Sequence, residues 1–131
     1  MESEVHKMKV EDLMRAPYYV DKNIGLKEVA KIMSSKNIGS LIFMPSGKIE
    51  GILTERDLLK NYEKNSKLKD VMSENVIVIS PGSDINEAMR LMKENSIKKL
   101  PVVDNEKLVG IITLTDIAAH LDELEEEFFF E

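Results

Sequence analysis

Two short segments of this chain carry residue types that could bind a small polar ligand. Residues 51–57 (Gly-Ile-Leu-Thr-Glu-Arg-Asp) recur as residues 110–116 (Gly-Ile-Ile-Thr-Leu-Thr-Asp), so each ends in a threonine and, three residues later, an aspartate. A carboxylate as short as that of Asp57 or Asp116 can accept hydrogen bonds from the two hydroxyl groups of a ribose. Arg56 adds a cationic fork suited to phosphate oxygens, and the second segment has Thr115 at that position. We call residues 54–57 the first motif and residues 113–116 the second motif.

The same spacing also has a purely structural interpretation. A threonine at the start of a helix can cap an early backbone N–H, while a carboxylate three residues later accepts the N–H of the threonine itself. A helix N-terminus that follows an apolar strand is, on the other hand, a common place for a phosphate to bind. For both motifs the sequence therefore leaves open a helix cap and a ligand site.

Both motifs belong to a long internal repeat. The second motif follows the first by 59 residues, and an offset of 58 aligns Asp-Leu-Met at residues 12–14 with Asp-Val-Met at residues 70–72. A period of this length is too long for a small solenoid unit and too short for an independent domain, which predicts two units that share one core. We expect an N-terminal extension (1–9), repeat 1 (10–60), a linker (61–67), repeat 2 (68–120) and an acidic, aromatic tail (121–131).

The hydrophobic pattern predicts strand, helix, strand, strand and helix in each repeat. In repeat 1 one helix is expected to bury Leu26, Val29, Ile32 and Met33, and a second helix is expected to begin at Thr54. In repeat 2 a helix is expected to be capped by Ser83. The predicted strands are residues 18–20, 41–44 and 49–53 in repeat 1, and residues 76–79, 100–103 and 107–112 in repeat 2. Strands and helices that alternate in this way indicate the α/β (α+β) class.

The repeated segments resemble a pair of CBS domains (cystathionine β-synthase domains), the regulatory tandem also called a Bateman module. The resemblance implies tandem β-α-β-β-α repeats with pseudo-twofold symmetry and two small mixed sheets packed face to face. It also implies two clefts between the repeats, each able to accept an adenosine-containing ligand. The resemblance is carried by residues 12–14, 70–72 and 100–104 and by the two segments 51–57 and 110–116.

The resemblance implies a role for residues on both sides of the motifs. One cleft would place Tyr18 near the base and would be lined by Gly39, Ser40, Thr54, Arg56 and Asp57. The other would place Ile77 near the base and would be lined by Lys98, Lys99, Pro101, Thr113 and Asp116. Lys98 and Lys99 would point toward phosphates, although a solvated loop is an equal alternative for them. Which of the two clefts is the better phosphate site stays open.

These residues predict a non-catalytic regulatory module that binds AMP, ADP or ATP. No nucleophile–base pair is expected, and no metal site or required cofactor is predicted. One alternative is a ligand of the S-adenosylmethionine type, which shares the ribose but lacks phosphates. The other is a ligand-free structural or interaction module that acts through its dimer and its C-terminal tail.

Composition limits the partners further. Six acids lie in residues 121–131, so the net charge of −6 belongs to that tail and the rest of the chain is neutral, which predicts no nucleic-acid partner. No apolar run is long enough to span a membrane, no signal peptide is evident and cysteine is absent, which favours the cytoplasm. We expect a stand-alone homodimer that contacts an unknown effector protein. The tail has two interpretations, a solvated helix end or an acidic helix whose apolar stripe contacts a partner. The stripe consists of Ile117, Leu121, Leu124 and Phe128.

Overall fold

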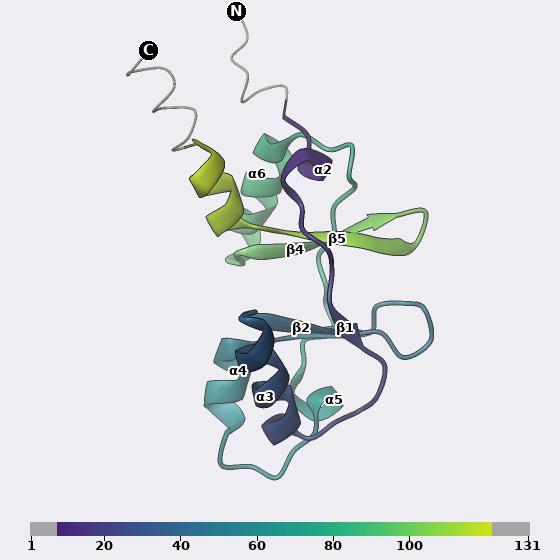
Figure 1. Ribbon diagram of the computed structural model, residues 1–131, viewed down its shortest axis with the longest axis vertical. Coiled ribbons are helices and arrows are strands. Elements are labelled where there is room, and N and C mark those ends of the chain that lie inside the picture. Colours follow the sequence, from purple (N-terminus) through teal and green to yellow (C-terminus); the bar gives the residue numbers. More distant parts are fainter. Residues whose placement is uncertain (1–7, 122–131) are drawn as a thin grey trace, which may run out of the picture. The chain divides into compact units, whose positions relative to one another are not determined.

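The computed structural model describes residues 8–121, so Leu124 and Phe128 of the predicted tail stripe lie outside the described residues. These residues form two compact units (Figure 1). One unit holds residues 18–76, and the other holds residues 8–17 together with residues 77–121. Each unit has a small sheet packed with helices, in agreement with the predicted α/β (α+β) class. Each unit also has its own hydrophobic core, so the prediction of one shared core is wrong.

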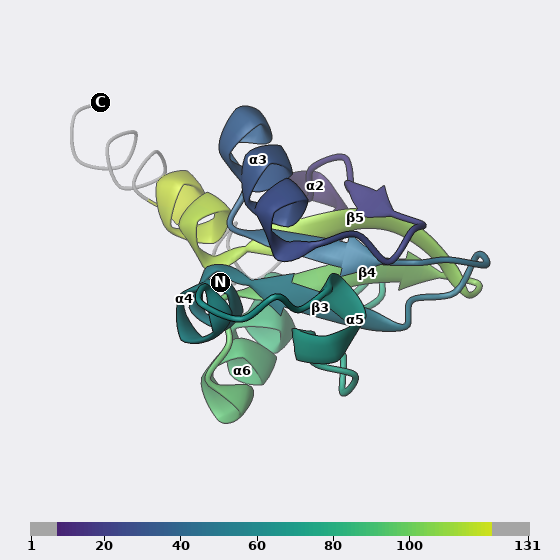
Figure 2. The same cartoon turned by 90° about the horizontal axis from the view of Figure 1, so that it is seen from below.

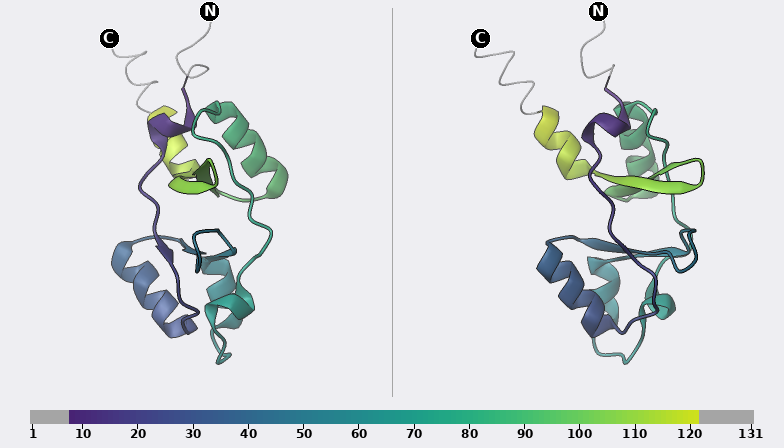
Figure 3. Two further views of the ribbon diagram at one scale, coloured as in Figure 1. Left: turned by 90° about the vertical axis from the view of Figure 1, so that its right-hand side faces the viewer. Right: turned by 45° about the vertical axis from the view of Figure 1, so that its right-hand side comes forward.

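In the unit of residues 18–76, three strands form a mixed sheet in the order β1 (Tyr19–Val20), β2 (Ser40–Phe43) and β3 (Gly51–Thr54). β1 runs parallel to β2, and β3 runs antiparallel to it. Helices α3 (Leu26–Lys36) and α4 (Glu55–Asn61) lie on the same face of this sheet (Figure 3), and α5 (Leu68–Val71) completes the unit. The core consists of Leu26, Val29, Met33, Leu41, Phe43, Leu53 and Leu68.

The other unit is built on the hairpin of β4 (Lys99–Asp104) and β5 (Lys107–Thr113), whose strands run side by side in Figure 2. Asn105 and Glu106 form the turn with φ values of 50° and 67°, the left-handed backbone that a two-residue hairpin requires. Helix α6 (Ile85–Asn95), helix α2 (Val10–Leu13) and a helix that runs from residue 114 to the last described residue, 121, pack with it. The core consists of Val10, Ile79, Ile85, Ala88, Met92, Leu100, Val102, Ile112 and Ile117.

The predicted strand at residues 76–79 is wrong, because only Ile79 pairs, in one parallel bridge with Val102. The amide of Ile79 donates to the carbonyl of Pro101 at 3.1 Å, and the amide of Val103 donates to the carbonyl of Ile79 at 2.9 Å. The next bond of a parallel ladder would need an N–H on Pro101, and proline has none. Repeat 1 has Ile42 at that position, and there β1 forms.

The predicted cap of α6 is also corrected by one residue. Asp84, not Ser83, is the N-cap: its Oδ1 accepts the amide of Asn86 at 2.8 Å, and the helix begins at Ile85. The carbonyl of Ser83 accepts the amide of Val10 at 2.8 Å instead. Asp84 is as good a capping residue as serine, so the sequence pattern alone does not separate the two.

The first segments of the two repeats are exchanged between the units. Helix α2 and Arg15 belong to repeat 1 in sequence, yet Arg15 exchanges two backbone hydrogen bonds with Ile111, at 2.9 and 3.0 Å. Helix α5 and Ser73 belong to repeat 2, yet Ser73 exchanges two backbone bonds with Ile52, at 2.9 and 3.0 Å. Each compact unit therefore contains the first segment of the other repeat. The repeat boundaries at residues 10–60 and 68–120 stay a prediction.

Local capping explains why the aspartate at the start of each repeat recurs, and the exchange explains the methionine. Asp12 and Asp70 cap their own short helices, accepting the amides of Lys9 and Lys67 at 2.9 and 3.0 Å. Met14 then packs on Gly110, where an added Cβ would lie 2.6 Å from its Sδ. In the other unit an added Cβ on Gly51 would overlap the side chain of Met72. The glycine that opens each repeated segment therefore leaves room for a methionine.

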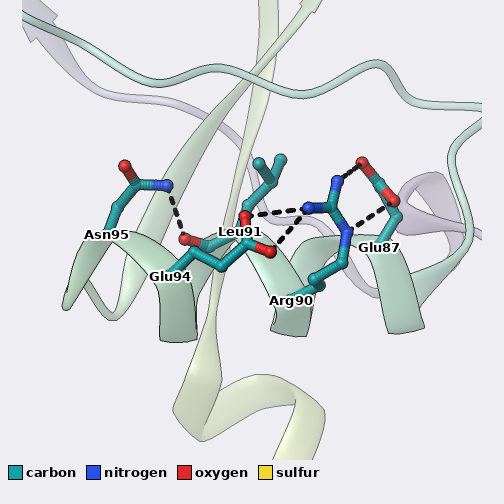
Figure 4. Close-up of polar contacts among 5 residues, drawn as sticks. All are labelled: Glu87, Arg90, Leu91, Glu94 and Asn95. Carbon is teal, nitrogen blue, oxygen red and sulfur yellow. Dashed lines mark hydrogen bonds and ion pairs between the residues drawn. The ribbon is translucent and has the colours of Figure 1, made fainter.

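A charged cluster on α6 has a structural role. The guanidinium of Arg90 donates to Glu87 at 2.5 Å and to Glu94 at 2.8 Å (Figure 4). The hydrogen bonds to Glu87 and Glu94 raise the pKa of Arg90 above its usual range. All three side chains lie on one exposed helix surface at spacings of three and four residues, where such pairs support the helix itself.

Candidate functional site

The residues predicted around the first motif meet at one end of the β1–β2–β3 sheet. Ser40 at the start of β2 pairs with Thr54 at the end of β3, and the carbonyl of Gly39 accepts the amide of Glu55 at 3.2 Å. Tyr18 immediately precedes β1, which runs parallel to β2, so it reaches the same end of the sheet. Its ring is partly exposed, whereas Ser40 is buried.

Within the first motif, Thr54 holds one oxygen of the Asp57 carboxylate. Oδ2 of Asp57 accepts the backbone N–H of Thr54 at 2.8 Å and its hydroxyl at 3.1 Å, so the helix cap that the spacing predicted is present. Oδ1 of Asp57 receives no hydrogen bond or ion pair from any residue between 8 and 121. The carboxylate is thus fixed in orientation by one oxygen and can accept hydrogen bonds on the other. Arg56, next to it in the chain, is exposed.

Lys36 is a cation at this end of the sheet that the sequence reasoning missed. Its Nζ lies 4.4 Å from the centre of the Tyr18 ring, a cation–π contact. The last turn of α3, which carries Lys36, leads directly into β2, so the ring and the ammonium group are brought together by the strand pairing. The two residues are 18 positions apart, and no spacing pattern in the sequence links them.

The residues predicted around the second motif meet at the corresponding end of the β4–β5 hairpin. Lys99 pairs with Thr113, and the carbonyl of Lys98 accepts the amide of Leu114 at 2.9 Å. Ile77 lies two residues before Ile79, which forms a single parallel bridge with Val102 of β4. Because the pairing is parallel, Ile77 lies toward the start of β4. Lys98 is exposed, and Pro101 is almost fully buried inside β4.

The second motif differs from the first because an arginine already occupies its carboxylate. Oδ2 of Asp116 accepts the hydroxyl of Thr113 at 2.8 Å, and the amide of Asp116 donates to that hydroxyl at 3.1 Å. Oδ1 of Asp116 forms an ion pair with Arg15 at 2.7 Å. The Asp116 side chain is only 11% exposed, whereas that of Arg15 is 74% exposed.

Arg15 is the second residue that the sequence reasoning missed, although a signal for it exists. The offset of 58 that aligns residues 12–14 with 70–72 continues by one residue, from Arg15 to Ser73. Both residues pair through their backbones with the strand that leads into a motif, at Ile111 and Ile52. An arginine therefore pairs with the strand that leads into the second motif, and a serine pairs with the strand that leads into the first.

Other kinds of site find no support in the described part of the chain. No three His, Cys, Asp or Glu side chains of residues 8–121 are grouped so that they could hold a metal ion. No helix within the same residues has the length and apolar character needed to cross a membrane.

Comparisons with known proteins agree on one family. A family model described as the CBS domain matches residues 10–64 and 68–123. The CBS domain-containing protein YhcV of Bacillus subtilis is 30% identical over 106 residues, which cover 77% of this chain and 76% of YhcV. The crystal structure of the CBS domain pair of protein MJ0100, in complex with 5′-methylthioadenosine and S-adenosyl-L-methionine, has a TM-score of 0.83. It is 31% identical, and the match covers 88% of this chain and 97% of that one.

Some relatives are much longer than the matched segment. A 33.4 kDa protein in the ribosomal RNA operon of Thermofilum pendens is 36% identical over 116 residues, which cover 86% of this chain and 39% of that protein. The chain thus spans about two fifths of the length of that relative.

Proposed function

The chain belongs to the CBS domain family, and on this premise we propose that it is a non-catalytic regulatory module that binds an adenine nucleotide. The ligand is AMP, ADP or ATP, held by the two motifs in the clefts that the family resemblance implies between the repeats. Occupancy is transmitted to an effector protein or through the chain's own dimer, and a ligand shifts such an assembly only by binding one arrangement more tightly. The module acts in the cytoplasm and needs no nucleic acid.

The observation that carries this proposal is the state of the Asp57 carboxylate. Thr54 fixes Oδ2 with two hydrogen bonds, and Oδ1 has no partner among residues 8–121. A carboxylate oriented in this way is prepared to accept the hydroxyl groups of a ribose, and such charge-assisted bonds are stronger than neutral ones. The half-buried position of Asp57 strengthens these bonds further, because solvent screens them less.

Arg56 separates a phosphorylated ligand from an unphosphorylated one. Arg56→Ala should weaken ATP binding at least about tenfold, since a hydrogen bond between charged groups contributes about 1.5–3 kcal/mol. Binding of S-adenosylmethionine should change less than about twofold, because that ligand has no phosphate. Isothermal titration calorimetry with both ligands measures this difference. Equal loss for both ligands, or loss for neither, would contradict a phosphate contact by Arg56.

The second candidate is an S-adenosylmethionine-type ligand. It is favoured by the CBS domain pair of protein MJ0100, which was crystallised with 5′-methylthioadenosine and S-adenosyl-L-methionine. Both classes share the adenosine that Asp57 would hold, so the free oxygen of Asp57 supports either. We favour a nucleotide because the positive charge of Arg56 can pair with phosphate oxygens, which S-adenosylmethionine lacks.

The third candidate, a structural or interaction module without a ligand, would act through the expected homodimer and the C-terminal tail. Helix α4 has no buried residue, and Leu59 on it and Tyr62 after it are 73% and 74% exposed. Their spacing of three residues places both side chains on one face of the helix. We place the contact with a second copy on this face, because two exposed apolar side chains on a helix favour burial.

Leu59→Glu should therefore convert the dimer to a monomer, since it would place a charge in an apolar contact. Lys60→Glu, one residue along the same helix, is the matched control and should leave the dimer intact. Sedimentation-velocity ultracentrifugation of the two variants and the wild type measures the result. A wild-type monomer, or dissociation caused equally by both variants, would remove α4 from the dimer contact.

A further inference from the structure

We propose that Arg15 makes the second motif selective for phosphorylated ligands, an inference that rests on the proposed function. Each oxygen of the Asp116 carboxylate already has a partner, Thr113 on Oδ2 and Arg15 on Oδ1. Each carboxylate oxygen can accept more than one hydrogen bond, but the Asp116 side chain is only 11% exposed, so we infer that a ribose reaches Oδ1 only when the guanidinium of Arg15 moves aside. The ligand must therefore compete with a side chain of the protein itself.

The side chain of Arg15 can change its partner while its backbone stays in place. Its backbone is fixed by two hydrogen bonds to Ile111, at 2.9 and 3.0 Å, so the start of its side chain stays beside the second motif. Its side chain is 74% exposed, and its guanidinium contacts Asp116 through one nitrogen, Nη2, at 2.7 Å. An exposed arginine with spare N–H donors can swing to a new acceptor at little cost.

The charge of the ligand decides whether this displacement is compensated. When a ribose takes Asp116, Arg15 loses its acidic partner, and phosphate oxygens on the same ligand offer it a new, bidentate one. A neutral nucleoside has no phosphate to pair with Arg15. It therefore loses the free energy of the broken ion pair between Arg15 and Asp116. The second motif should therefore discriminate between AMP and adenosine more sharply than its ribose contacts alone would allow.

The first motif lacks this device. Ser73 stands at the position that matches Arg15, and Oδ1 of Asp57 has no partner among residues 8–121. Arg56 is nearby in sequence but forms no ion pair with Asp57 in that part of the chain. Adenosine and AMP should thus both enter the first motif, whereas the second motif should favour AMP.

The reciprocal variants Arg15→Ser and Ser73→Arg test the inference. Two-dimensional ¹H–¹⁵N NMR titrations with adenosine and with AMP give a dissociation constant for each motif, from the amides of residues 54–57 and of residues 113–116. For Arg15→Ser, the preference of the second motif for AMP over adenosine should fall at least about tenfold, because the competing ion pair and the phosphate contact both disappear. For Ser73→Arg, adenosine should bind the first motif several-fold more weakly.

The outcomes separate the two claims. Saturable binding to the wild type with an unchanged AMP preference in Arg15→Ser overturns the role of Arg15 and leaves the proposed function in place. No binding of either ligand to the wild type or to Arg15→Ser overturns both. Thermal unfolding of each variant checks the fold, and because Arg15 is exposed, its replacement should leave the unfolding midpoint close to that of the wild type.

Discussion

In the Asp57→Asn variant, the affinity for AMP at the first motif should fall about 100-fold. When the amide oxygen of asparagine stays on Thr54, its NH₂ group replaces the carboxylate oxygen that has no protein partner and cannot accept a ribose hydroxyl. Each hydrogen bond to a charged acceptor contributes about 1.5–3 kcal/mol. The amide oxygen of asparagine can still accept the N–H of Thr54, so the helix cap survives and the fold should persist. Isothermal titration calorimetry with AMP measures the loss.

Asp70→Asn is the matched control for this variant. Asp70 caps α5 with the same geometry, accepting the amide of Lys67 at 3.0 Å, but it lies outside both motifs. It should bind AMP like the wild type. Equal losses in the two variants would show that capping, not ligand contact, explains the effect, and wild-type affinity in Asp57→Asn would contradict the ribose role of Asp57.

The second large effect concerns the exchanged segments. Leu68→Ala should lower the free energy of unfolding by about 3 kcal/mol, because Leu68 is fully buried and its truncation leaves a cavity. Leu68 starts repeat 2 in sequence, yet it packs in the core of residues 18–76. Hydrogen exchange followed by mass spectrometry should therefore show the greatest loss of protection in peptides from residues 26–53.

Val10→Ala provides the reciprocal measurement. Val10 starts repeat 1 and is fully buried in the core of the other unit, so its truncation should expose residues 85–112 first. Its effect should be smaller, because fewer methyl groups are removed. If Leu68→Ala instead loosened residues 85–112, and Val10→Ala residues 26–53, each unit would be made from one sequence repeat and the exchange would be contradicted.

Much of each unit could be predicted from the sequence because the signals are local. The apolar run of β2, the spacing of Leu26, Val29 and Met33 on α3, and the Thr-to-Asp cap of the first motif all depend on neighbours within one turn or one strand. The absence of a strand at residues 76–79 could also be predicted from the sequence, because Pro101 lacks the N–H that pairing with such a strand would need.

The exchange of the first segments was not predictable in this way. Periodicity shows that α2 and α5 are equivalent, but not which strand each of them joins. The ion pair of Arg15 with Asp116 depends on that choice, since it joins residues about 100 positions apart that meet only through the pairing of Arg15 with Ile111. The carboxylate that looked equivalent to Asp57 therefore has a different environment.

Thermal unfolding of the wild type and of Asp57→Asn with AMP, ADP, ATP and S-adenosylmethionine tests the central claim most directly. A nucleotide at 100 times its dissociation constant should stabilise the wild type by about 2.7 kcal/mol. We predict this stabilisation with at least one of AMP, ADP and ATP, and a smaller one in Asp57→Asn, because only the second motif then binds the nucleotide. No stabilisation by any nucleotide, or a stabilisation in Asp57→Asn as large as that of the wild type, would contradict a nucleotide site built on the first motif.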